Sequence, residues 1–242
     1  MSFIYALVPV VMGLYLHKSG RLNAIPAQGI VLALHAATIL STFVFIATFG
    51  SSLARFYAFL ASFLSTVVAM LANYGLPGRA NYQAWISQAA QGADFPFFMF
   101  SSIFLSAQSV GLGDVLGLFI VGRRALWAIG LALEKLQTDR SLIKRGQGLW
   151  RAVRANEAVV LRLMALFEIF IGFYLIAILL TPSRQIFTIF VYWNFLRLRF
   201  NAPRSRQLHT EAWTLLGGWA RPLTNHELVG KGVDKVKTWF RQ

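Results

Sequence analysis

The sequence predicts an all-α, polytopic membrane protein built of transmembrane or re-entrant helical hairpins, with amphipathic helices at the membrane surface. Of the 242 residues, 57% are hydrophobic and only 13% are charged. That is too little charge to cover the surface of a soluble domain. The apolar residues are gathered in runs close to the roughly 20 residues that a helix needs to cross a bilayer. We therefore expect one helical membrane domain over residues 1–200 and a basic cytoplasmic tail over 201–242.

Four apolar runs define two helical hairpins. Residues 29–49 and 53–70 are separated by only three small residues, so the two runs form an antiparallel pair. Residues 159–180 make a third long helix, and the shorter run 186–200 is expected to return alongside it. The first residues, 1–16, are apolar but lack the basic start of a secretory signal, which favours a retained membrane-embedded or interfacial segment.

Residues 95–122 form either one long, bent span or two short legs of a re-entrant hairpin. The run is interrupted by Gln108, Gly111, Gly113 and Asp114. A basic cytoplasmic segment, 123–157, follows. Within it Leu126, Ile129, Leu133 and Leu136 recur at helical spacing, which predicts a helix lying on the membrane surface.

The distribution of charge favours the hairpin interpretation. Basic residues gather in 17–28, in 123–157 and in the tail, whereas the bends at 50–52 and 108–113 carry no charge. Basic loops stay on the cytoplasmic side, and three hairpins place every basic segment there. Short legs occupy mainly the cytoplasmic leaflet, which favours positive curvature. We therefore expect the three bends to share one face.

The net charge of +14 indicates a partner of opposite sign. Anionic lipid headgroups suit a hydrophobic chain with basic loops better than nucleic acid does. The chain has no cysteine, and its four histidines show no metal-ligand spacing. No paired carboxylates or Ser-His-Asp arrangement is visible, so we expect no enzyme, no cofactor and no metal.

The C-terminal residues predict an amphipathic, membrane-binding helix. Pro222 is expected to end the preceding segment, and Thr224 to Glu227 has the form of a capping box. An apolar face and a basic face then follow, formed respectively by Val229, Val233, Val236, Trp239 and Phe240, and by Lys231, Lys235 and Lys237. Packing of this helix on the rest of the protein is the alternative.

Glu168 lies deep in the third long run, where a lone charge costs at least about 2.5 kcal/mol. We expect an intramembrane polar clamp in which Glu168 is held by Asn194 or Arg197 of the returning helix. A proton relay is the alternative. Arg55 is expected to reach the interface, and Asp114 to cap the helix that follows it.

Two stretches resemble the transmembrane protein 33 family, which includes the pore-membrane proteins of nuclear pores. The first runs from Val160-Leu161-Arg162 to Phe167-Glu168-Ile169-Phe170, although the family's Asn before the glutamate is absent. The second is the aromatic run 190–200, Phe-Val-Tyr-Trp-Asn-Phe-Leu-Arg-Leu-Arg-Phe. Upstream, Phe56-Tyr57, Leu76-Pro77 and residues 98–105 are similar to the family's segments in the same order.

The resemblance implies a non-enzymatic protein of the endoplasmic reticulum membrane and nuclear envelope that shapes or stabilises curved membrane. It also implies partners: membrane-shaping proteins such as reticulons, and nuclear pore or transport-receptor proteins. Two other functions stay open from the residues alone. One is a small transporter or channel that uses Glu168, and the other is an accessory subunit of a larger membrane complex.

Overall fold

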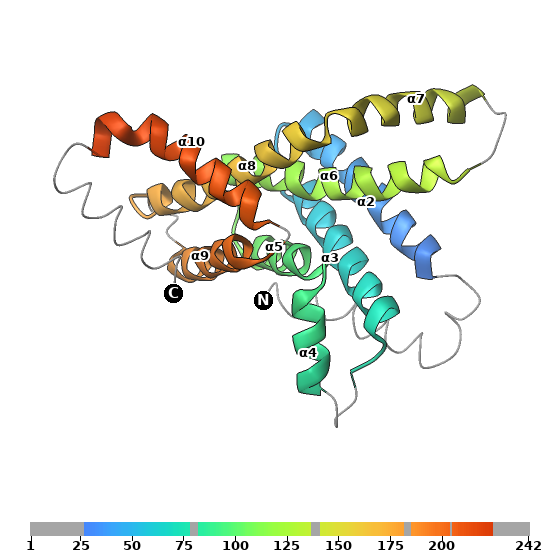
Figure 1. Cartoon of the computed structure of the whole chain (residues 1–242), viewed down its shortest axis with the longest axis horizontal. Coiled ribbons are helices and arrows are strands. Elements are labelled where there is room, and N and C mark those ends of the chain that lie inside the picture. Colours follow the sequence, from blue (N-terminus) through green and yellow to red (C-terminus); the bar gives the residue numbers. More distant parts are fainter. Residues whose placement is uncertain (1–26, 78–81, 137–140, 182–184, 204, 225–242) are drawn as a thin grey trace.

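The computed structural model describes residues 27–77, 82–136, 141–181, 185–203 and 205–224. Helices make up nearly all of this part of the chain, and it contains no strand. They are α2 (Ala27–Ala47), α3 (Ser52–Tyr74), α4 (Tyr82–Gln91), α5 (Phe95–Ser106), α6 (Leu112–Glu134), α7 (Ser141–Ala155), α8 (Glu157–Ile178), α9 (Ile186–Asn201) and α10 (Arg206–Thr224) (Figure 1). By length and apolar composition, α2, α3, α6 and α8 can each cross a membrane. The predicted all-α, polytopic membrane fold is confirmed.

Helices α2 and α3 form the first hairpin, as the spacing predicted. Phe49 and Gly50 both have positive φ, at 52° and 102°, and so reverse the chain within a few residues. The hydroxyl of Ser51 then accepts a hydrogen bond from the backbone N–H of Ala54 and caps the start of α3. The two helices pack along each other for most of their length.

The second hairpin has one short leg and one long leg. The break falls after Ser106, which confirms that residues 95–122 are divided between two helices. Helix α6, however, continues through Arg123 and Arg124 to Glu134. The helix predicted from Leu126, Ile129, Leu133 and Leu136 is therefore present up to Glu134, but as the second half of α6 and not as a separate helix. The amphipathic helix of the basic segment is α7, which folds back along α6.

The third hairpin is formed by α8 and α9, close to the predicted bounds. Helix α10, which the sequence pattern did not predict, follows and packs on both of them. Its inner face carries Leu208, Ala212 and Leu216 at four-residue spacing, against Ala165 and Ile169 of α8. Helix α10 runs to Thr224, so Pro222 does not end it as expected.

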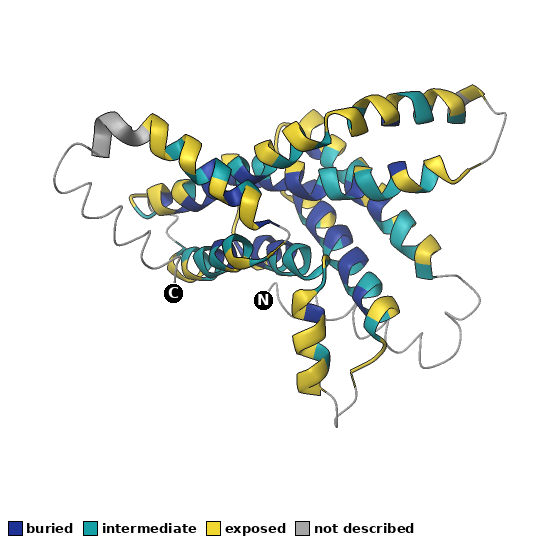
Figure 2. Ribbon diagram, in the orientation of Figure 1, coloured by how far each residue is buried: buried dark blue, intermediate teal, exposed yellow. Residues whose placement is uncertain are grey.

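Aromatic side chains of α3, α5 and α9 form much of the core of the bundle. Figure 2 shows the buried stretches of the helices in dark blue, gathered toward the middle of the molecule. Phe59 stacks on Phe104 with ring centroids 4.8 Å apart, and Phe100 lies 5.6 Å from Phe195. Tyr192 is fully buried beside them. The core therefore joins the short helices α5 and α9 to α3, and neither of them depends on lipid alone for packing.

Candidate functional site

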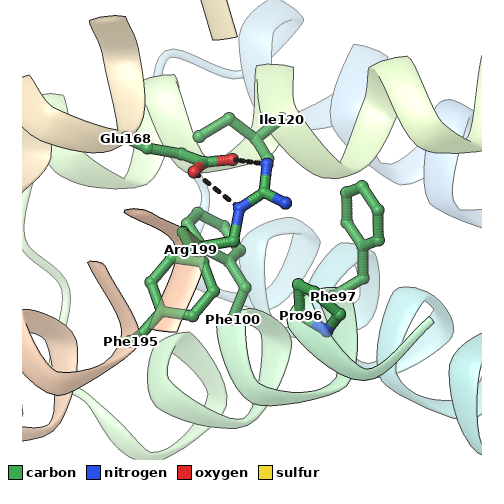
Figure 3. A pocket seen from close by; sticks show the side chains of 7 residues that line it. All are labelled: Pro96, Phe97, Phe100, Ile120, Glu168, Phe195 and Arg199. Carbon is green, nitrogen blue, oxygen red and sulfur yellow. Dashed lines mark hydrogen bonds and ion pairs between the residues drawn. The ribbon is translucent and has the colours of Figure 1, made fainter. Parts of the chain in front are cut away.

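Glu168 of α8 is clamped by two basic side chains from different helices. The Arg199 guanidinium of α9 donates to both of its oxygens, from Nε at 2.9 Å and from Nη2 at 3.0 Å (Figure 3). Nε2 of His209, on α10, lies 2.9 Å from the same carboxylate. Glu168 is only 3% exposed and His209 is fully buried. The clamp thus ties three helices together at one depth.

The predicted partners of Glu168 were wrong. The side-chain amide of Asn194 donates to the carbonyl of Phe190, one turn back on its own helix. Arg197 precedes Arg199 by two residues, so its side chain leaves α9 about 200° around the helix from the side chain of Arg199, which is the one that faces Glu168. Sequence reasoning assigned Arg199 and His209 to the basic tail, and only the fold brings them to Glu168.

A small recess beside the clamp is lined by Pro96, Phe97, Phe100, Ile120 and Phe195, together with Glu168 and Arg199 (Figure 3). It has no room for a water molecule. A proton relay needs water or a chain of titratable groups next to the carboxylate. The recess leaves no room for water beside Glu168, and the two side chains that contact the carboxylate, Arg199 and His209, bind it to α9 and α10, which favours a structural clamp.

A second buried cation lies at the same end of the bundle. Arg124 of α6 donates to Asp94, at the start of α5, over 2.6 Å and to the hydroxyl of Ser65 in α3 over 3.0 Å. Its guanidinium also lies 5.0 Å from the centre of the Phe97 ring. Phe97 also lines the recess beside Glu168, so the two ion pairs are neighbours. We call Asp94, Arg124, Glu168, Arg199 and His209 the charged layer.

At the other end of the bundle, Arg55 and Asp114 form a fully enclosed ion pair. Arg55 Nε lies 2.6 Å from Asp114 Oδ1, and Arg55 Nη2 donates to the carbonyls of Phe104 and Ala107. The second oxygen of Asp114 accepts from the N–H of Val110 at 2.7 Å, just ahead of α6. Asp114 therefore caps the chain just ahead of α6, as expected. The expectation that Arg55 reaches the interface is wrong, because Arg55 is buried.

Gln185 joins the third bend to the second. Its side chain accepts from the N–H of Gln108 at 3.1 Å and donates to the carbonyl of Gln108 at 3.3 Å. Since Arg55 lies near the first bend and bonds Ala107, the three bends lie together at one end. The three bends thus lie at one end of the bundle, and the expectation that they share one face of the membrane stays a prediction. We call Arg55, Gln108, Asp114 and Gln185 the bend layer.

The two layers are close together along the helices. About 10 to 14 residues of helix separate them in α3, α5, α6, α8 and α9, which is about 15–21 Å at 1.5 Å per residue. The hydrocarbon core of a bilayer is about 30 Å thick. The distance between the layers is therefore clearly less than a full bilayer core.

Among the described residues, the bend end exposes large apolar side chains. Phe49 is 100% exposed and Leu180 92% exposed, and Ile186 and Phe187 are also largely uncovered. The backbone groups that the second bend frees are meanwhile paired inside the protein by Arg55, Asp114 and Gln185. Irregular backbone at membrane depth requires such internal pairing.

Amphipathic helices flank the opposite end, beyond the charged layer. Helix α7 covers the second half of α6, α10 covers α8, and α4 contacts α3 and α5. Arg162 of α8 pairs with Glu211 of α10 at 2.9 Å, with both side chains at least one-third exposed. Exposed ion pairs and helices with one charged face belong in water or among headgroups, not in hydrocarbon.

The predicted membrane-binding residues Val229, Val233, Val236, Trp239, Phe240, Lys231, Lys235 and Lys237 lie outside the described residues, as do residues 1–16. In the part of the chain that the structure describes, no group of His, Asp or Glu side chains has metal-binding geometry.

The fold and these layers define a polytopic helical membrane protein in which buried ion pairs fasten short helical legs. The family model "Transmembrane protein 33/Nucleoporin POM33" matches residues 21–222, and the chain belongs to this family of nuclear pore and endoplasmic reticulum membrane proteins. Searches of curated proteins and of solved structures give no match.

Proposed function

We propose that this protein is a non-enzymatic shaping and scaffolding protein of the endoplasmic reticulum and nuclear envelope, which inserts a membrane wedge. By wedge we mean a helical bundle that displaces more lipid in one leaflet than in the other. Family membership supports the location. Contact with reticulon-like or nuclear pore partners is part of the proposal. The short distance between the charged layer and the bend layer supports the mechanism.

The depth of insertion follows from the two ends of the bundle. The charged layer and the amphipathic helices favour the headgroup region. The bends, about 15–21 Å deeper, then end within the hydrocarbon of the far leaflet and stop short of its surface. Exposed Phe49 and Leu180 suit that position, because they lie at the bends and contact no protein.

Unequal area in the two leaflets is the physical source of curvature. Near the charged layer, the bundle is widened by α4, α7 and α10, whereas only the hairpin bends reach the far leaflet. A body that is wider in one leaflet expands that leaflet, so the membrane becomes convex on that side. Curved membranes, such as tubules and pore rims, would in turn be stabilised by it.

Thiol labelling tests the depth, because the chain has no native cysteine. Single cysteines are placed at Ser51, Gln108 and Thr181 in the bends, with Ser141→Cys at the start of α7 as the control. In sealed vesicles we expect a membrane-impermeant reagent to label Ser141→Cys from one side. The three bend positions should resist it from both sides and react with a permeant reagent. Labelling of the bends from the side opposite Ser141 would show that the helices span the bilayer and would refute the wedge.

Vesicle shape tests the activity. We expect the reconstituted protein to convert large vesicles into small vesicles or tubules as protein density rises. The double substitution Asp94→Leu/Arg124→Leu removes part of the charged layer without changing the net charge, so α5 and α6 can sink deeper and reshaping should weaken. Arg162→Leu/Glu211→Leu removes an exposed pair of the same charges and should leave reshaping unchanged. Vesicles that keep their size at every density of the unaltered protein would refute the proposal.

A further inference from the structure

One side of α9 faces away from the rest of the bundle. Helices α5, α8 and α10 contact α9, which lies at an edge of the molecule (Figure 1). Its outward side carries three exposed apolar side chains, Phe187 at 76%, Phe190 at 67% and Leu198 at 52%. Tyr192, on the inward side, is fully buried. We call the surface formed by Phe187, Phe190, Asn194 and Leu198 the outer face of α9.

Asn194 lies at the centre of the outer face. It follows Phe190 by four residues and precedes Leu198 by four, so the three side chains leave α9 in nearly the same direction. The buried Tyr192 is two residues from Asn194 and therefore about 200° around the helix. A polar amide is thus surrounded by large apolar side chains on the side of α9 that points out of the bundle.

The amide of Asn194 has unused hydrogen-bonding capacity. One of its N–H groups donates to the carbonyl of Phe190 at 2.8 Å. Its second N–H and its oxygen have no hydrogen-bond partner among the residues that the structure describes. In water the solvent would supply these bonds. In an apolar medium they have to come from another protein group, because an unpaired amide is costly there.

The depth of Asn194 places its amide among acyl chains. Along α9 it lies about 13 Å from Gln185 of the bend layer and about 7 Å from Arg199 of the charged layer. In the proposed wedge the charged layer meets the headgroups, and Asn194 lies below it in hydrocarbon. If the long helices instead span the bilayer, the bends lie at one surface and Asn194 is still within the core of about 30 Å. The environment of the amide is therefore the same in both arrangements.

We propose that the outer face of α9 binds the same face of a second copy of this chain. Both copies insert in one orientation, so a two-fold axis along the membrane normal brings the two Asn194 side chains together at the same depth. An amide carries both a donor and an acceptor, and two amides across such an axis form reciprocal N–H···O hydrogen bonds. Because Asn194 is complementary to itself, a second copy fits this face better than a partner of different chemistry.

Dilution of the reconstituted protein in lipid tests the association. Full chains carry a donor or an acceptor fluorophore at Thr214→Cys, an exposed position on α10, and energy transfer is measured as the lipid-to-protein ratio rises. We expect a monomer–dimer equilibrium in which Asn194→Leu dissociates at several-fold less lipid. Asn156→Leu is the matched control, because the amide of Asn156 also donates to the carbonyl four residues back, at 3.0 Å, but is exposed between α7 and α8. It should dissociate as the unaltered protein does.

Disulfide formation locates the contact, because the chain has no native cysteine. Leu198→Cys lies on the outer face, and Phe43→Cys, at a position that is 66% exposed on α2, is the control. Under oxidation in vesicles of equal protein density, we expect Leu198→Cys to give a disulfide-linked dimer and Phe43→Cys to remain monomeric. Adding Asn194→Leu to Leu198→Cys should lower the yield of dimer several-fold.

Three results would overturn the dimer. They are energy transfer no greater than that of randomly mixed monomers, equal dissociation of Asn194→Leu and the unaltered protein, and equal crosslinking of Leu198→Cys and Phe43→Cys. Crosslinking of Leu198→Cys to another protein in native membranes, with none between copies, would assign the outer face to a different partner and overturn the second copy. The bend-labelling experiment reports only the depth of the bends, so the wedge and the dimer fail independently.

Discussion

Arg55 and Asp114, 59 residues apart in the chain, form a 2.6 Å ion pair that joins α3 to the start of α6. Asp114 has no solvent exposure, and the arginine also satisfies two carbonyls that the end of α5 leaves unpaired. One side chain of the first hairpin thus completes the backbone hydrogen bonding of the second. The stability of the bend layer depends on this contact.

We expect Arg55→Leu to destabilise the protein strongly, because it leaves the Asp114 carboxylate and two carbonyls buried without a partner. Breaking one side of a buried pair costs about 3–5 kcal/mol. The measurement is thermal unfolding in detergent. Arg55→Leu/Asp114→Leu removes both charges and should be more stable than Arg55→Leu alone. A single variant that unfolds at the temperature of the unaltered protein would contradict the assigned role.

Glu168→Gln is expected to loosen α10 from α8 and α9, since both Arg199 and His209 lose their charged partner. Glu211→Gln is the matched control, because its pair with Arg162 is exposed and such pairs contribute at most about 1 kcal/mol. Proteolysis between α9 and α10 reports the loosening. Equal digestion of the two variants would argue against a clamp.

Gly130→Ala tests the contact between α6 and α7, where Gly130 packs against Trp150. A Cβ at Gly130 would clash with the Trp150 ring, so the ring has to move. Overpacking of this kind typically costs about 1–3 kcal/mol. Gly148→Ala is the control, because nothing lies within 4 Å of its Cβ and alanine favours a helix over glycine by up to about 1 kcal/mol. Trp fluorescence during unfolding should show opposite shifts for the two variants.

The predicted C-terminal amphipathic helix has its own test. Val233→Asp/Val236→Asp puts charges on its apolar face and should abolish binding of the tail to small anionic vesicles. A flotation assay with a peptide covering 222–242 measures this. A peptide that binds vesicles of no size would contradict membrane binding by the tail. The proposal for the helical bundle would be unaffected.

The sequence predicted the helices whose apolar runs end at clear breaks. The Gly50 turn, the interruption near Gln108 and the break after Leu180 all gave bounds within a few residues of those observed, because hydropathy and turn residues are local signals. The expectation that the bends lie together rested on the absence of charge in the first two bends and on the single charge, Arg184, in the third.

The sequence could not predict the long-range ion pairs. Arg123 and Arg124 looked like the end of a membrane segment, because an arginine without a visible partner favours the interface. In the fold, Asp94 neutralises Arg124, and α6 continues for another ten or so residues. Glu168 was correctly expected to need a partner, but the choice between Arg197 and Arg199 depends on the rotation of α9 against α8. Pairing at this distance is set by tertiary packing alone.

The contact between Gln108 and Gln185 has a consequence for biosynthesis. The two residues are 77 positions apart, so the ribosome delivers Gln108 well before its partner. Until Gln185 follows, the amide and carbonyl of Gln108 have no acceptor or donor from the third hairpin, and lipid offers none. We therefore expect the second hairpin to reach its final depth only after Gln185 has been inserted beside it.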